Sequence, residues 1–195
     1  EAFPTTMREI PVSWKENNEL LRFNLMLTFK EYTLEGSVLQ PITSLPQGID
    51  ISTNLVKICN NKGFDVIKAS MTNIPFPDNS FDGIICIASY HHLDNDLDRK
   101  KTLNEIYRIL KDDGRVLIEV WSKEQPDKSN KNTHNFINND NLVKWTSIKT
   151  GKIYYRYYNI YSYGQLEKEI ISLKPEFKII NSGHEKGNYF IHLSK

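Results

Sequence analysis

The chain has 195 residues and a formal net charge of +1, and 39% of its residues are hydrophobic and 25% charged. This length and composition predict one packed domain over residues 1–195, and the small net charge excludes a general attraction to nucleic acid. Because no apolar run approaches the roughly 20 residues of a membrane span, we expect no contact with membranes.

Helices and strands are predicted to alternate along the chain. In chain order we expect a helix at 14–32, strands at 36–39 and 47–51, a helix that follows 52–54 and ends near 60–63, strands at 64–68 and 81–88, a helix from 94–96 to about 110, a strand at 115–121, a helix at 164–173, and strands at 177–180 and 189–193. The near-continuous apolar character of 81–88 is typical of a strand at the centre of a sheet. Such alternation favours an α/β fold with parallel pairing, closed by a hairpin formed from the last two strands.

Residues 127–141 differ from the rest because they are polar and rich in Asn and Lys. This composition predicts a mobile loop or lid. A low-complexity insert with no role explains it equally well.

The two cysteines, Cys59 and Cys86, form no CxxC pair and have no companion His at ligand spacing. We therefore expect reduced thiols and no metal site, as is typical of cytoplasmic or nuclear proteins.

Asp50 is the clearest candidate for a binding residue because it ends an apolar strand. At the carboxyl end of a parallel strand, an acidic side chain points into the crevice where ribose hydroxyls can be held. The alternative is a helix cap, since Asp followed by Ser often starts a helix.

Four further motifs stand in a fixed order: Gly48 to Ser52, Ile74 to Asp82, Ile87 to His92, and Arg108 to Gly114. Together they resemble the class I S-adenosylmethionine-dependent methyltransferases over most of residues 36–121. The resemblance implies a Rossmann-like, doubly wound, mostly parallel seven-stranded sheet with an antiparallel edge hairpin.

A narrower resemblance follows from the second half of the chain. Its motifs are Val120 to Gln125, Leu142 to Trp145, Tyr155 to Tyr161 with Gly164 to Leu166, and Gly187 to Tyr189. They are similar to those of the eukaryotic tRNA wobble-uridine methyltransferases, which methylate the carboxylate of 5-carboxymethyluridine. This family implies the tRNA anticodon loop as substrate, a small zinc-binding activator subunit as partner, and a cytoplasmic location.

The resemblance also implies which residues bind S-adenosylmethionine. Asp50 would hold the ribose, and Ile51 and Ile74 would flank the adenine, with core packing as the alternative for both isoleucines. Ser70 and Met71 lie where the adenine edge is read, but the family commonly has Asp at the position of Ser70, so a charge-assisted bond of roughly 1.5–3 kcal/mol is lost there. Ile87 and Ala88 would form the strand end beneath the sulfonium.

His91 and Arg156 are the candidates for catalytic residues. A carboxylate nucleophile is already ionised at pH 7, so the reaction needs positioning and no general base. The guanidinium of Arg156 matches the two oxygens of a carboxylate, and a phosphate contact is its other possible role. His91 would face the substrate at the cofactor mouth or serve as a structural histidine; its neighbour His92 would point away from it, which leaves no metal site.

The aromatic residues around Arg156 suit an unstacked RNA base, although a strand with aromatic packing explains them too. A small-molecule methyltransferase is therefore the alternative function.

One departure from the family lies between residues 39 and 48, where Gln40 to Gln47 contain no glycine. A glycine turn is expected there to seat the methionine part of the cofactor. Either a segment is missing from the sequence at this place, or the chain is a degenerate, non-catalytic binding module. The first explanation is favoured because 40–47 cannot form the missing helix while the other motifs are kept.

Overall fold

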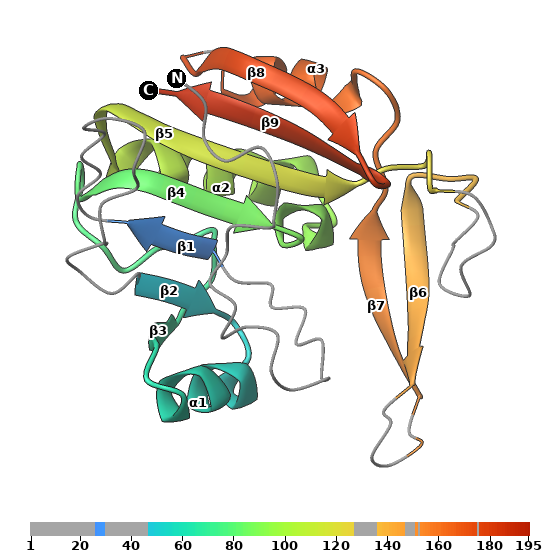
Figure 1. Ribbon diagram of the computed structural model, residues 1–195, viewed down its shortest axis with the longest axis horizontal. Helices are drawn as coiled ribbons and strands as arrows, with labels where there is room; N and C mark the ends of the chain where they lie inside the picture. The colour runs from blue at the N-terminus through green and yellow to red at the C-terminus, as the bar shows by residue number, and fades with distance from the viewer. Residues whose placement is uncertain (1–25, 30–46, 127–135, 147–150, 152, 175) are drawn as a thin grey trace.

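The computed structural model describes residues 26–29, 47–126, 136–146, 151, 153–174 and 176–195 (Figure 1). Its elements are β1 (Met26–Phe29), β2 (Gln47–Asp50), α1 (Thr53–Asn61), β3 (Asp65–Lys68), β4 (Phe81–Ile87), η3 (Tyr90–His92), α2 (Asp96–Ile109), β5 (Leu110–Trp121), β6 (Asp140–Thr146), β7 (Ile153–Asn159), α3 (Gln165–Leu173), β8 (Lys178–Glu185) and β9 (Asn188–Ser194). None of the helices in these ranges is long and apolar enough to cross a membrane.

Seven strands form one sheet in the order β3-β2-β1-β4-β5-β9-β8, with β4 at its centre as predicted. The pairs β2–β3 and β4–β5 are parallel. Because β1 runs antiparallel to both of its neighbours and β9 runs antiparallel to β5 and β8, most described pairings are antiparallel. The prediction of a mostly parallel sheet is therefore wrong, whereas the antiparallel edge hairpin is confirmed.

The strand β1 corrects the prediction of a helix over 14–32 at residues 26–29, because 26–28 pair with β2 and 26–29 pair with β4. The rest of 14–32 lies outside the described residues. Two flanking strands offer hydrogen bonds on both sides, and this tertiary pairing overrides the helical pattern. Met26 lies beside Ile49 and Cys86, so the amino end of β1 stands where the first parallel strand of this fold would end. The strand predicted at 36–39 lies outside the described residues.

Local signals explain the elements that were predicted well. Ser52 caps α1 by accepting a hydrogen bond from the N–H of Leu55, and Asn95 caps α2 in the same way through the N–H of Asp98. The hairpin strands β8 and β9 are longer than predicted because their turn is only two residues. Lys186 and Gly187, with φ of 50° and 84°, form that turn, and positive φ at both positions is typical of a type I′ hairpin.

The main core lies between the sheet and the helices α2 and α3, which Figure 1 shows behind the strands. Its fully buried residues include Phe81, Ile84, Leu103, Ile106, Val116, Ile118, Ile170 and Ile191. Figure 1 also shows the ribbon formed by β6 and β7 projecting from the end of the sheet. The first residues of β6, 140 and 141, fall inside the loop predicted at 127–141, so that prediction is wrong at its end. Residues 127–135 lie outside the described part of the chain.

A side-chain brace fixes the loop that connects β3 to β4. The guanidinium of Arg108 donates to the carbonyls of Ile74 and Phe76, at 2.9 and 2.7 Å, and binds both carboxylate oxygens of Glu105. Glu105 also accepts from the N–H of Ile74 at 2.6 Å. Through Glu105 and Arg108, the helix α2 therefore fixes the Pro-rich turn at Ile74 and Phe76, which follows residues 70–71.

We expect Glu105→Gln to lower the free energy of unfolding by about 1–3 kcal/mol at pH 7, since a charge-assisted bond to Arg108 is lost. The bond with Arg108 lowers the pKa of Glu105 from 4.5. This contribution is present above pH 4.5 and disappears as pH falls through the lowered folded pKa. Urea unfolding at pH 7 and pH 3 measures it. Asp112→Asn, at a side chain 92% exposed, is the control and should change little at pH 7; equal effects of both substitutions would contradict the brace.

Candidate active site

The candidate site lies at the carboxyl ends of β2 and β4. Asp50, the last residue of β2, is 4% exposed. Its Oδ1 accepts from the N–H of Ser52 at 2.6 Å. Its Oδ2 is buried without a hydrogen-bond partner among the described residues. A buried carboxylate oxygen that lacks a donor is costly, so this atom is suited to accept from the hydroxyl of a bound ligand.

Electrostatics at Asp50 link this residue to the ribbon. Burial raises the pKa of Asp50, whereas the Ser52 N–H and the positive charge of Arg156 act to lower it. An effect of Arg156 at this carboxylate requires that the guanidinium on β7 lie within electrostatic reach of the end of β2. The positive charge of Arg156, more than a hundred positions away in the sequence, therefore acts on the Asp50 carboxylate.

Ile51, which follows Asp50, is 72% exposed, whereas Ile74 is 3% exposed. Core packing therefore explains Ile74 but not Ile51, which presents an apolar side chain to solvent beside the Asp50 carboxylate. An exposed apolar side chain beside a polar group is the type of surface on which a flat base can pack.

Ser70 and Met71 follow β3 and are both half-buried. The Ser70 hydroxyl is paired with the hydroxyl of Thr72 at 2.8 Å and accepts from the Thr72 N–H at 3.2 Å. The Met71 side chain packs against the core, with its sulfur 3.9 Å from that of Cys86. Ser70 is therefore held by a local turn, and the Met71 side chain is part of the wall behind it.

Ile87 is the last residue of β4, and Ala88 follows it. The strand β1 lies between β4 and β2, the strand that ends with Asp50. Ala88 has φ of 53°, a left-handed conformation that non-glycine residues seldom adopt. The N–H of Ala88 donates to the carbonyl of Glu119 at 3.0 Å, and Ser89 Oγ donates to the carbonyl of Ile87 at 3.1 Å. These bonds hold a sharp turn with a small side chain at its apex, at the carboxyl end of β4.

His91 is fully buried, which does not agree with its predicted role as a substrate-facing catalytic residue. Its Nδ1 accepts from the N–H of Trp121 at 3.0 Å, and its ring lies 4.9 Å from that of Tyr158. The alternative interpretation, a structural histidine, fits these contacts. The rings of His91 and His92 also lie 4.6 Å apart instead of pointing away from each other, because residues 90–92 form a 3₁₀ turn and not an extended segment.

An aromatic anchor of His91, His92, Trp121 and Tyr158 joins the ribbon to the sheet. Tyr158 stacks on Trp121 with ring centroids 4.6 Å apart, and His92 lies 4.3 Å from Tyr158. His92 Nδ1 also contacts the carbonyl of Tyr157 at 2.7 Å. Burial lowers the pKa of His92, and the charge of Arg156 acts in the same direction. Beyond the separate Trp and Tyr motifs, no sequence pattern indicates this anchor, because only the fold brings these residues together.

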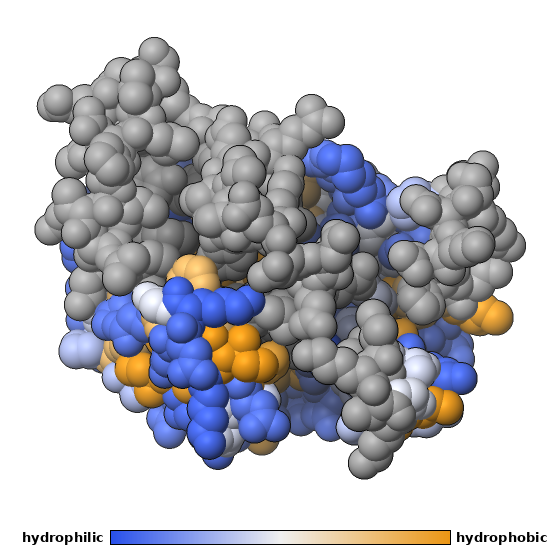
Figure 2. All heavy atoms as spheres, turned by 60° about the horizontal axis from the view of Figure 1, so that its bottom comes forward, coloured by the Kyte–Doolittle hydropathy of each residue, from blue (hydrophilic) through white to orange (hydrophobic). Residues whose placement is uncertain are grey.

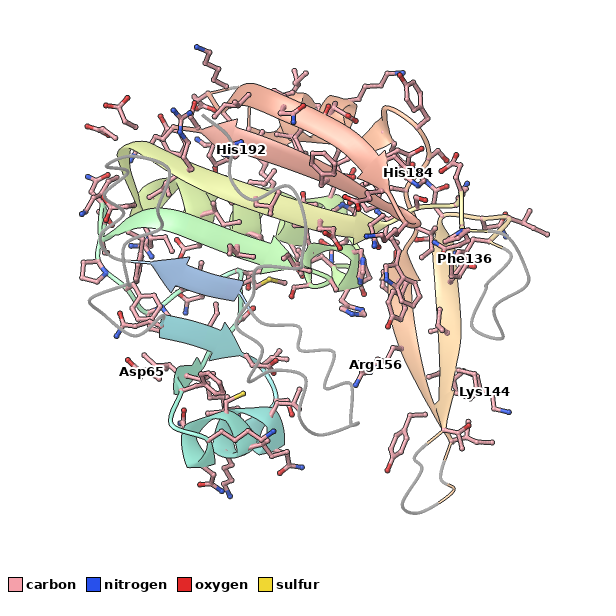
Figure 3. All side chains as sticks on the ribbon, in the orientation of Figure 1. Asp65, Phe136, Lys144, Arg156, His184 and His192 are labelled. Carbon is pink, nitrogen blue, oxygen red and sulfur yellow. The ribbon has the colours of Figure 1, made fainter. Side chains whose placement is uncertain are left out.

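Arg156 lies two residues before Tyr158, so both side chains share one face of the ribbon. Tyr158 is buried against the sheet, while Arg156 is half-buried. Figure 3 shows Arg156 on β7, on the side of the ribbon that faces β2 and α1. The strand interpretation of Tyr154 to Tyr158 is confirmed. Within the described part of the chain, no group of three His, Cys, Asp or Glu side chains could hold a metal ion.

Known proteins that resemble this chain are methyltransferases. The family model described as a methyltransferase domain matches residues 36–118. Residues 36–118 are therefore similar to a methyltransferase domain. A solved S-adenosylmethionine-dependent methyltransferase from Methanosarcina mazei has a TM-score of 0.57 at 15% identity, covering 76% of this chain and 81% of that one. This likeness identifies the fold as that of the class I S-adenosylmethionine-dependent methyltransferases.

Two curated relatives of the methyltransferase domain are named as tRNA (carboxymethyluridine(34)-5-O)-methyltransferases. The protein of Arabidopsis thaliana is 41% identical over 101 residues, which are 52% of this chain and 22% of that protein. The protein of Xenopus tropicalis is 38% identical over 87 residues, which are 45% of this chain and 14% of that protein. The chain therefore resembles this family, and it spans less than a quarter of the length of either relative.

Proposed function

We propose that this chain is an S-adenosylmethionine-dependent tRNA methyltransferase that methylates the carboxylate of 5-carboxymethyluridine at the wobble position. The observation that carries the proposal is the similarity of residues 36–118 to a methyltransferase domain, together with the buried carboxylate of Asp50 at the end of β2. A buried carboxylate, Asp50, can hold a ribose, and Arg156, a guanidinium suited to a carboxylate substrate, lies within its electrostatic reach.

The described residues fit the nucleoside half of S-adenosylmethionine. Asp50 Oδ2 would accept from a ribose hydroxyl, and Ile51 would pack on the adenine, whose edge would meet Ser70 and Met71. Ile87 and Ala88 would lie beneath the sulfonium. The glycine turn expected for the methionine half falls between residues 39 and 48, where the sequence has no glycine and 40–46 lie outside the described residues.

S-Adenosylmethionine, when bound, supplies an electrophilic methyl group. The chain would contribute positioning: Arg156 would orient the carboxylate of the substrate so that one oxygen faces the methyl group in line with the bond that breaks. The anchor at Tyr158 would hold Arg156 in place. No described group needs to accept a proton, since a carboxylate nucleophile is ionised at neutral pH.

A small zinc-binding activator subunit is part of the proposal. Ile58 on α1 and Ile67 on the edge strand β3 are each 38% exposed. Figure 2 shows hydrophobic surface between hydrophilic side chains at the end of the molecule that carries α1. An edge strand with exposed apolar side chains is a surface that a partner commonly covers.

Transfer of a labelled methyl group tests the proposal. The substrates are tRNA that lacks only this methyl group and the same tRNA without the carboxymethyl group, each with and without a zinc-binding activator subunit. We expect label only in the first tRNA. Label in small molecules alone would favour a small-molecule methyltransferase, and binding of S-adenosylmethionine without any transfer would favour a non-catalytic module.

A further inference from the structure

The ribbon has a second face that the candidate active site does not use. Register places Leu142 opposite Tyr157, Lys144 opposite Tyr155, and Thr146 opposite Ile153, so these residues share one face. Leu142 is 70% exposed, Tyr155 64% and Ile153 47%. Large apolar side chains gathered on one exposed face mark an interaction surface more often than a solvated one.

The chemistry of this face is aromatic and cationic. Lys144 is directly opposite Tyr155, and Figure 3 shows Lys144 projecting away from the side on which Arg156 lies. The acidic residue of this face, Asp140, is engaged by the hydroxyl of Tyr157 at the base of the ribbon. Of the described basic residues along 140–159, Lys144 lies on this face and Arg156 on the opposite one. The face therefore has positive charge beside an exposed ring.

We propose that this outer face, formed by Leu142, Lys144, Ile153 and Tyr155, binds the unpaired bases of an RNA loop next to the nucleotide in the active site. Bases stack on exposed aromatic rings, and lysine contacts phosphate, so the two groups together match single-stranded RNA. The inference rests on the proposed function in that RNA is the substrate. It adds that the two faces of the ribbon have different roles. Arg156 on one face orients the reacting group, and Tyr155 on the other face binds a neighbouring base.

The test is fluorescence anisotropy of a labelled anticodon stem-loop RNA with the whole chain. We expect Tyr155→Ala to weaken binding by about five- to a hundredfold and Tyr155→Phe to bind like the unchanged chain, because the ring and not the hydroxyl stacks. Lys144→Ala should reduce the slope of log affinity against log salt by about one. Tyr163→Ala, at a ring 87% exposed on another segment, is the control and should have no effect.

Three results would overturn the inference: unchanged binding by Tyr155→Ala, equal affinity for a fully paired RNA of the same length, or a change of oligomeric state by Tyr155→Ala in sedimentation, which would make this face a contact between copies. Circular dichroism checks that each variant folds. RNA binding that depends on Tyr155 without any methyl transfer would leave the surface in place and contradict the proposed function. Methyl transfer that is indifferent to Tyr155 would contradict only the surface.

Discussion

Replacing Asp50 by Asn is expected to weaken S-adenosylmethionine binding by about ten- to a hundredfold while leaving the unliganded fold as stable as before, or more stable. The loss of affinity follows from the loss of a charge-assisted bond between Asp50 Oδ2 and the ribose. The retained stability follows from burial, because the uncharged amide has no charge to desolvate. Calorimetry measures the affinity, and thermal unfolding without ligand measures the stability.

The sign of the stability change follows from the pKa of Asp50. Burial raises this pKa from 3.8, so the folded state binds the proton more tightly than the unfolded state does. Stability therefore decreases as pH rises from about 4 through the folded pKa, and at pH 7 the folded chain carries a poorly solvated charge. Asn removes that penalty, so the advantage of Asp50→Asn should vanish at pH 3.

Asp65→Asn is the matched control for this substitution. Asp65 is an exposed residue of the neighbouring strand β3, where it accepts from Gln47 Nε2 at 2.8 Å. We expect it to affect neither binding nor the pH dependence of stability by a measurable amount. If Asp50→Asn binds S-adenosylmethionine as tightly as the unchanged chain, Asp50 does not hold the ribose.

Replacing Arg156 by Ala is expected to reduce methyl transfer to tRNA by roughly a hundredfold or more, because a misplaced carboxylate loses the benefit of orientation. Binding of S-adenosylmethionine should change much less. Arg156→Lys should restore only part of the activity, since an ammonium cannot bind two carboxylate oxygens in the fork geometry of a guanidinium. Single-turnover transfer rates at saturating cofactor separate the two steps.

A spectroscopic measurement on Arg156→Ala tests whether Arg156 lies close to the aromatic anchor. The charge of Arg156 acts to lower the pKa of His92, so Arg156→Ala should raise that pKa in an NMR titration. Arg115→Ala, at an exposed residue early in β5, is the control for both measurements. A pKa of His92 that does not move would place Arg156 away from the anchor, and full activity of Arg156→Ala would remove it from the site.

Elements with strong local signals could be predicted from the sequence. The Ser52 and Asn95 caps define the starts of α1 and α2, and the apolar run of β4 indicates its central position. Asp50 was identified for the same reason, because its place at the end of a strand is a local property. These signals come from residues that are close in sequence, so they can be recognised without knowing how the rest of the chain folds.

Features that depend on distant pairing could not be predicted. The strand 26–29 forms because β2 and β4 provide hydrogen-bonding edges, and its direction is not encoded in a four-residue segment. His91 has the sequence context of a residue at the site mouth, but the Trp121 N–H and the Tyr158 ring enclose it. In both cases the deciding contacts lie 19 or more positions away, where hydrophobic periodicity carries no information.

The central claim is that the strand ends at Asp50 and Ala88 bind the nucleoside of S-adenosylmethionine, although β1, which lies between β2 and β4, runs antiparallel to both. Titration of ¹⁵N-labelled protein with S-adenosylhomocysteine, followed by NMR, tests this claim most directly. We predict chemical-shift changes concentrated at residues 50–52, 70–71 and 87–89. A titration without shift changes, or with changes confined to residues distant from these three segments, would contradict it.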